Sequence, residues 1–154
     1  RRYELIEKII VKLPSKFQKM SAVILDGNFL NFDPFVGTNY HLLSVVKPAK
    51  IEIQKSKFLK LKNTKKNLIN FDYIKNKKNS NFKKFINLSK KFVPELIKAQ
   101  YVKSYYTIRC VNNAQNSHQR LNEILIYNKN IISVIAGKWN TVVDVADKIK
   151  KIIR

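Results

Sequence analysis

The stretch Ser21-Ala-Val-Ile-Leu-Asp-Gly-Asn-Phe-Leu-Asn-Phe32 decides the fold class of this chain. Two runs with strand-like composition, Ser21–Leu25 and Phe29–Phe32, flank the dipeptide Asp26–Gly27. An Asp-Gly pair is favoured in a two-residue type I′ turn, because both central residues of that turn need positive φ. The stretch therefore predicts a tight hairpin, and a hairpin makes its two strands antiparallel.

Strand patterns continue on both sides of this hairpin. The run Tyr3–Leu13 partly alternates between apolar and charged residues, as a half-buried strand does, and Pro14 ends it. Beyond the hairpin, Tyr40–Val46 and Ile51–Gln54 are further candidate strands. Strands that follow one another through short turns form a meander, so we expect a mainly antiparallel sheet that also includes Val102–Val111.

The second half of the chain mixes helices with strands. Residues 55–81 are rich in Lys and Asn, and we interpret them as a surface excursion with a short helix near residues 70–75. A helix is predicted over Asn81–Lys91, and Pro94 can open a further helical turn through Gln100. The remaining elements are strands at Glu123–Tyr127 and Ile131–Ile135 and an amphipathic helix from about Asn140. The predicted fold class is therefore α+β, an antiparallel sheet with flanking helices.

Lysine dominates the composition, and the 154 residues carry a formal net charge of +21. Such a charge favours nucleic-acid binding. However, 26 Lys stand against 5 Arg, whereas specific readers of phosphate and base edges use the planar Arg fork. With 17 Asn and 19 Ile, the composition is typical of an AT-rich genome, and we interpret the Lys-rich surface as a solvated face. A basic nucleic-acid-binding module remains the alternative function.

Cysteine and histidine are scarce. Cys110 is the one cysteine and cannot form an internal disulfide, which fits a reducing cytoplasm. His41 and His118 are the two histidines, and with few acids they form no metal-binding motif of recognisable spacing. No segment is typical of a signal peptide or a membrane span. We therefore expect a cytoplasmic protein without a metal site or a membrane partner.

The stretch Ile131–Thr141 carries the most informative chemical pattern. An apolar strand runs into Gly137, and a helix follows. A helix N-terminus exposes unpaired backbone N–H groups and the positive end of the helix dipole, and Lys138 adds a full charge there. Asn140 or Thr141 can cap the helix. Such a corner suits a phosphate or the anionic edge of a reduced flavin, and a simple turn and cap is the alternative.

Three segments together point to a known family. Ser133–Thr141 has the pattern S-V-x-x-G-K-x-x-T, which resembles the C-terminal flavin-contacting segment of the D-amino-acid-oxidase-like family of FAD-dependent oxidoreductases. Val23–Phe35 resembles the hairpin that enters the substrate-domain sheet of that family. Phe92–Leu96, followed by Tyr105–Arg109, resembles the helix and strand before the return to the cofactor. The segments occur in the family's order, and the resemblance covers most of the chain except about residues 55–80.

The resemblance implies a division of the chain and a cofactor. Residues 1–127 would form the substrate-binding sheet region, and 128–154 would be the return segment of an FAD-binding domain. The glycines are at positions 27, 37 and 137, so this chain lacks the G-x-G-x-x-G motif of related enzymes. The chain alone is therefore expected to be inactive. Its C-terminal apolar face is expected to be covered by substitute contacts, either from a partner chain such as a second copy or from the helix folded back on the sheet.

The resemblance also assigns residues. The FAD contacts would be Gly137, Lys138, Trp139, Asn140 and Thr141. An anionic small-molecule substrate of the amino-acid or hydroxy-acid type would be bound by Arg109, Arg120 and Tyr106, because a guanidinium pairs with a carboxylate in a bidentate manner. The family commonly has Arg-Pro at such places, whereas Cys110 and Leu121 follow the two arginines here. No catalytic residue is assigned, since the flavin itself accepts the hydride.

Overall fold

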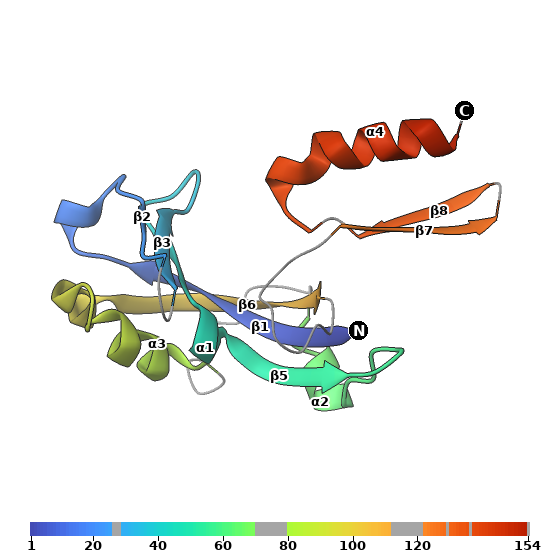
Figure 1. The fold of residues 1–154 in the computed structure, drawn as a ribbon. Helices are drawn as coiled ribbons and strands as arrows, with labels where there is room; N and C mark the ends of the chain where they lie inside the picture. Colours follow the sequence, from blue (N-terminus) through green and yellow to red (C-terminus); the bar gives the residue numbers. More distant parts are fainter. Residues whose placement is uncertain (26–28, 70–79, 112–121, 129, 136, 154) are drawn as a thin grey trace. The chain divides into compact units, whose positions relative to one another are not determined.

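The computed structural model describes the chain except for residues 26–28, 70–79, 112–121, 129, 136 and 154 and the side chain of Trp139. The chain is an α+β protein with mainly antiparallel strands, as the sequence predicted. It forms two compact units (Figure 1). The larger unit is Tyr3–Cys110, and the smaller unit is Val111–Arg154 together with Arg1–Arg2.

The sheet of the larger unit contains six strands. Their order is β2-β3-β4-β1-β5, and β6 also pairs with β1 (Figure 1). The strands are β1 (Arg2–Lys12), β2 (Ala22–Val23), β3 (Leu30–Pro34), β4 (His41–Val45), β5 (Lys50–Lys55) and β6 (Gln100–Val111). The strands that the sequence predicted between Tyr3 and Gln54 are therefore all present, with small shifts at their ends.

The predicted hairpin is confirmed in its strands. β2 and β3 are antiparallel, with Ala22 opposite Phe32 and Val23 opposite Asn31. β6 lies in the same six-stranded sheet, as expected. The predicted Asp26–Gly27 turn itself falls within residues 26–28, outside the described part of the chain.

Helices of the larger unit are short. They are the 3-10 helices η1 (Ser15–Phe17) and η3 (Pro94–Lys98) and the α-helices α1 (Val46–Ala49), α2 (Asn63–Lys66) and α3 (Phe82–Ser89). α3 and η3 correspond to the predicted helix and helical turn, and Pro94 is at the start of η3. The sequence did not predict α1, which separates β4 from β5. The helix expected near residues 70–75 lies outside the described residues.

One face of the sheet packs against α3 and η3. Alternate strand residues point to the same face, so Ile9, Leu43 and Phe32, which lie opposite one another in register, share the inner face. Phe85 of α3 is fully buried against this face. The core comprises Ile9, Val11, Leu13, Phe17, Leu30, Phe32, Leu43, Val45, Ala49, Phe82, Phe85, Ile86 and Leu96.

The smaller unit is a hairpin followed by a helix. β7 (Glu123–Asn128) pairs antiparallel with β8 (Ile131–Ile135), and η4 (Trp139–Thr141) leads into α4 (Val142–Ile152). The division between the units falls between Cys110 and Val111, whereas the sequence placed it at 127/128. The reason is that β7 pairs with β8 along its length and so belongs with the C-terminal elements. Arg1 pairs with Glu123 of β7, which accounts for the first two residues belonging to this unit.

The apolar face of α4 is only partly covered. Val145 is buried, with 6% of its surface exposed, whereas Val142 is 54% exposed. The other exposed large apolar residues of the unit are Leu125, Ile126, Tyr127, Ile131, Val134, Val143, Ile152 and Ile153. Among the described residues, no helix has the length and apolarity needed to cross a membrane.

Candidate functional site

The predicted flavin corner is organised by a residue that precedes it. The side-chain oxygen Oδ1 of Asn122, just before β7, accepts a hydrogen bond from the backbone N–H of Gly137 at 2.7 Å. The Thr141 hydroxyl lies 3.0 Å from the same oxygen and 2.7 Å from the carbonyl oxygen of Lys138. Asn122 thereby ties the start of the hairpin to the turn between β8 and α4, and the sequence pattern alone did not single it out.

These contacts change how the corner presents its hydrogen-bond donors. The Gly137 N–H donates to Asn122 and is therefore not available to a ligand. Thr141 is the N-cap of α4, yet its side chain makes no capping bond. Its hydroxyl has one hydrogen and points back to Asn122 or to the Lys138 carbonyl. The expected side-chain cap at Asn140 or Thr141 is therefore not formed.

Charges at the corner are mixed. Lys138 and Asn140 are exposed. Asp144 is in the first turn of α4, where a carboxylate interacts favourably with the positive end of the helix dipole. An anion at this corner would gain from Lys138 and from the helix but would be repelled by Asp144. The side chain of Trp139, also predicted to contact the flavin, lies outside the described residues.

Arg109 is part of a buried ion pair. Its guanidinium donates through Nε to Glu4 Oε2 at 2.9 Å and also binds that oxygen through its terminal nitrogen. The Glu4 side chain is fully buried, and Lys50 Nζ lies 3.5 Å from its other oxygen. Arg109 is thus engaged by a carboxylate of the chain itself. It belongs to a different compact unit from Gly137, and a substrate-binding role for it stays a prediction.

Lys8 occupies the same face of the sheet as this ion pair. Its Nζ donates to the Ser44 hydroxyl at 2.6 Å, across the β1–β4 pairing in which Ile10 lies opposite Leu42. Burial lowers the pKa of the Lys8 ammonium, the positive charge of Arg109 lowers it further, and Asp33 partly opposes both effects. A half-buried amine with a lowered pKa is unusual on a surface that is otherwise crowded with solvated lysines.

The neighbouring strand completes this face. Asn31 of β3 lies opposite Ser44, and Asp33 lies opposite Leu42, so both share the face of Lys8. Asn31 donates to Asp33 at 2.7 Å, and Ser21 also binds Asp33. The polar residues on this side of the sheet, called the polar face below, are Glu4, Lys8, Asn31, Asp33, Ser44 and Arg109. The apolar Ile10, which is 0% exposed, and Leu42 share the same side. This side lies opposite the face that packs against α3.

Tyr106 lies on the inner face. It is 2% exposed, and its hydroxyl is 3.4 Å from the fully buried carboxylate of Glu7. Ser104 donates to the same carboxylate oxygen at 2.6 Å, and the backbone N–H of Asn81 donates to the other at 2.9 Å. Burial and the Glu7 charge raise the pKa of Tyr106. Tyr106 is therefore the interior member of the Tyr105–Tyr106 pair, in a network that joins β1, β6 and the start of α3.

The other candidate residues contribute less. Arg120 and His118 fall outside the described residues. A lone histidine on a strand is usually a packed core residue, and His41 is 3% exposed and packs edge-on against Phe32. A single cysteine is also usually a small core residue, but Cys110, near the end of β6, is exposed. Within the described ranges, no three His, Cys, Asp or Glu side chains gather in a way that could hold a metal ion.

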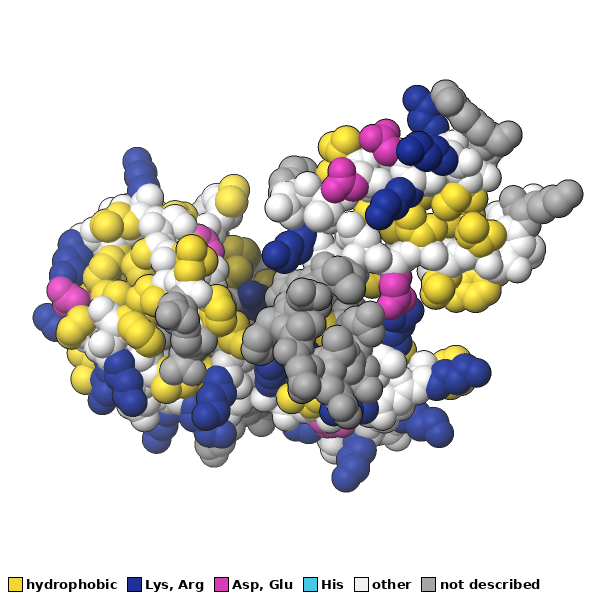
Figure 2. Space-filling model, in the orientation of Figure 1, with side chains coloured by type: hydrophobic (Ala, Val, Ile, Leu, Met, Phe, Trp, Pro, Cys, Tyr) yellow, Lys and Arg dark blue, Asp and Glu magenta, His cyan; other side chains and the backbone are white. Residues whose placement is uncertain are grey.

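Neither the face drawn in Figure 2 nor the aromatic residues of α3 support the nucleic-acid alternative. On the face shown in Figure 2, Lys and Arg side chains are spread around the molecule instead of gathering in one patch. Phe82 and Phe85, which lie between basic residues in the sequence, are 7% and 0% exposed. Buried rings cannot stack on nucleobases, so these two aromatic residues serve the core.

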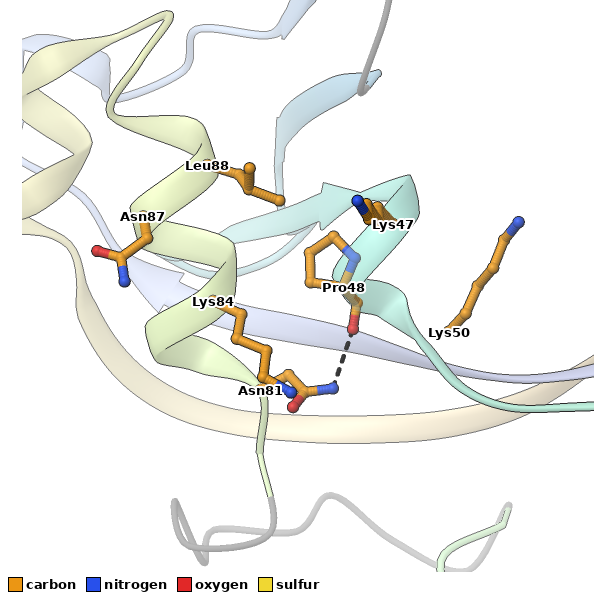
Figure 3. Close-up of a pocket in the computed structure, with 7 residues that line it drawn as sticks. All are labelled: Lys47, Pro48, Lys50, Asn81, Lys84, Asn87 and Leu88. Carbon is orange, nitrogen blue, oxygen red and sulfur yellow. Dashed lines mark hydrogen bonds between the residues drawn. The ribbon is translucent and has the colours of Figure 1, made fainter.

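A groove lies between α1 and α3. Its volume is about 430 Å³, and it is lined by Lys47, Pro48, Lys50, Asn81, Lys84, Asn87 and Leu88 (Figure 3). Asn81 donates to the Pro48 carbonyl at 3.0 Å. The Lys50 side chain extends away from Lys84, so the ammonium groups do not converge on one point. We do not assign a ligand to this groove.

Comparison of the chain with protein-family models, with curated protein sequences and with solved structures gave no match.

Proposed function

We propose that this chain is the C-terminal part of a flavin-dependent oxidoreductase resembling the D-amino-acid-oxidase-like family. The enzyme would oxidise a C–N or C–O bond of a small anionic substrate of the amino-acid or hydroxy-acid type, with FAD as the hydride acceptor. The observation that supports this most is the corner between β8 and α4. There Asn122 holds Gly137 and Thr141, and Lys138 is exposed at the start of a helix.

The corner suits one end of the cofactor. Because the Thr141 hydroxyl points away from the first turn of α4, no side-chain cap from that residue offsets the positive end of the helix dipole. Lys138 adds a full charge, so negative charge on the pyrimidine edge of the flavin ring would be stabilised here. When bound, FAD supplies the hydride acceptor. Nothing in this chain supplies the Gly-rich turn that would hold the pyrophosphate.

The expected affinity for flavin is therefore low. A helix N-terminus contributes about 0.3–1 kcal/mol to an exposed charge and about 2 kcal/mol when partly buried. Micromolar binding needs about 8 kcal/mol. We expect flavin mononucleotide to shift the backbone amide signals of residues 137–143 in NMR titrations without saturating at micromolar concentrations. Lys138→Met should reduce these shifts, because it removes the mobile positive charge beside the ring.

Lys148→Met is the matched control, since Lys148 is an exposed lysine of α4 that lies away from the corner. Equal losses in the two variants, or shifts scattered over the Lys-rich surface, would contradict the assignment of the corner. FAD fluorescence supplies a second readout. Saturable micromolar FAD binding would show that the chain carries a complete cofactor site, contrary to our proposal that it holds only one part of it.

The exposed apolar residues of the smaller unit lead us to expect a homo-oligomer. A two-stranded hairpin is marginally stable alone, and Val142 and Val143 remain 54% and 66% exposed. We expect sedimentation velocity to show association as the protein concentration rises, and Val143→Asp to weaken it. Val36→Asp, at a 92% exposed site in the larger unit, should have no effect. A monomer at every concentration would refute this expectation.

A further inference from the structure

We propose that Lys8 and the hydroxyl group of Ser44 bind the carboxylate of a small anionic ligand at the polar face. That this ligand is the substrate rests on the proposed function. The binding site itself is supported by contacts among residues of the larger unit. The residue that binds the anion would then be Lys8, four residues along β1 from Glu4, and not Arg109, which the sequence predicted.

Two of the partly buried cations at the polar face are engaged by a carboxylate. Arg109 and Lys50 are both engaged by Glu4. Asp33 accepts hydrogen bonds from Asn31 and Ser21. Among the residues that the structure describes, Lys8 has a hydroxyl partner but forms no ion pair. The Asp33 charge acts on Lys8, but no described carboxylate lies within ion-pair distance of it, and a ligand carboxylate would supply that direct contact.

The hydrogen-bond directions suit a carboxylate. The Lys8 ammonium has three hydrogens, and the contact with Ser44 uses one of them. Because the Ser44 oxygen accepts this bond, its own hydrogen is available to donate. Lys8 and Ser44 thus offer donors from two adjacent strands, which matches the two oxygens of a carboxylate. Ser44 is 8% exposed, so its position is set by the surrounding sheet.

Burial makes the charged form of Lys8 less favourable in the folded chain. Its lowered pKa means that the folded chain holds the ammonium less favourably than water does. Half-buried charges that a fold tolerates at such a cost are frequent at binding sites. A bound carboxylate would relieve the cost, because an opposite charge nearby favours the ammonium.

The test is an NMR titration of the complete 154-residue chain with acetate at constant ionic strength, following the lysine side-chain signals. Lys8→Met identifies the Lys8 signal by its loss. We expect a saturable shift of Lys8 in the wild-type chain. Followed through the backbone amides of Ser44 and Asn31, acetate affinity should fall at least tenfold in Lys8→Met. Lys12→Met is the matched control, because Lys12 is exposed and lies four residues from Lys8 on β1, on the same face of the strand. This variant should change the affinity less than twofold.

Several outcomes would overturn the proposal. Equal losses in Lys8→Met and Lys12→Met would mean that acetate responds only to the general positive charge. Tighter binding of inorganic phosphate at Lys8 would replace the carboxylate with a tetrahedral anion. An unchanged Lys8 signal in wild-type protein would refute the site, and if Lys8→Met failed to fold, Lys8→Arg would identify that signal by its loss while keeping the charge. No flavin is present in these titrations, so their outcome is independent of the corner at Gly137–Thr141.

Discussion

Replacing Glu4 with glutamine is expected to lower the free energy of unfolding by about 3 kcal/mol, near the lower end of the range for breaking a buried ion pair. Glu4 is fully buried and contacts both Arg109 and Lys50. The neutral amide would leave two positive charges next to each other without a counterion. The estimate is at the lower end because the side chains of Arg109 and Lys50 remain 29% and 26% exposed, so water can solvate them in part.

Urea unfolding followed by circular dichroism measures this change. Glu95→Gln is the control, because Glu95 pairs with Lys16 at the surface, where the two side chains are 41% and 54% exposed. Surface pairs contribute about 0–1 kcal/mol, so the control should stay close to the wild type. If Glu4→Gln and Glu95→Gln cost the same, the Glu4 pair does not anchor the sheet. Replacing Arg109 with methionine in the Glu4→Gln background should recover part of the loss.

Replacing Phe85 with alanine is expected to cost about 3–5 kcal/mol of unfolding free energy, as is usual for a fully buried aromatic residue. Phe85 is 0% exposed and lies in the core between α3 and the inner face of the sheet. Removing the ring leaves a cavity that the short helix α3 can close only in part. Since domains of this size are stable by only about 5–15 kcal/mol, the loss is a large share of the total and should clearly lower the unfolding temperature.

Phe58→Ala is the matched control for this change. Phe58 is 66% exposed and contacts the Lys57 ammonium, whose Nζ lies 5.5 Å from the ring centre. Its removal should cost about 1 kcal/mol or less. Thermal unfolding of the two variants distinguishes the cases directly. A Phe85→Ala chain as stable as Phe58→Ala would mean that α3 does not pack on the sheet as described.

The local patterns of the sequence were sufficient for the secondary structure of the larger unit. β1, the strands around Asp26–Gly27, α3 and the turn at Pro94 were all predicted, because periodicity and turn chemistry act over a few residues. The antiparallel sheet followed from the same local signals. α1 was missed, since nothing in the run before Pro48 separates one helical turn from a continuing strand.

The candidate sites depend on contacts between distant residues, which local sequence patterns do not predict. Gly137, Lys138 and Thr141 were recognised from the strand–glycine–helix pattern, but Asn122, 15 residues before Gly137, was not. Arg109 was recognised as a notable cation, but its partner Glu4 lies 105 residues away. The sequence could not reveal that Arg109 is engaged by Glu4, nor that Lys8 meets the hydroxyl of Ser44, 36 residues away.

The sequence by itself determined the strands, the main helices and the antiparallel class of this protein. Only the tertiary structure decided that Tyr106 faces the interior, that Glu4 holds Arg109, and that Lys8 and Ser44 meet on the opposite face. The reason is physical: a strand repeats every two residues, so the sequence defines two faces, but strand register and packing against α3 decide which face is buried. Strand register and packing therefore also decide which charged side chains meet across neighbouring strands.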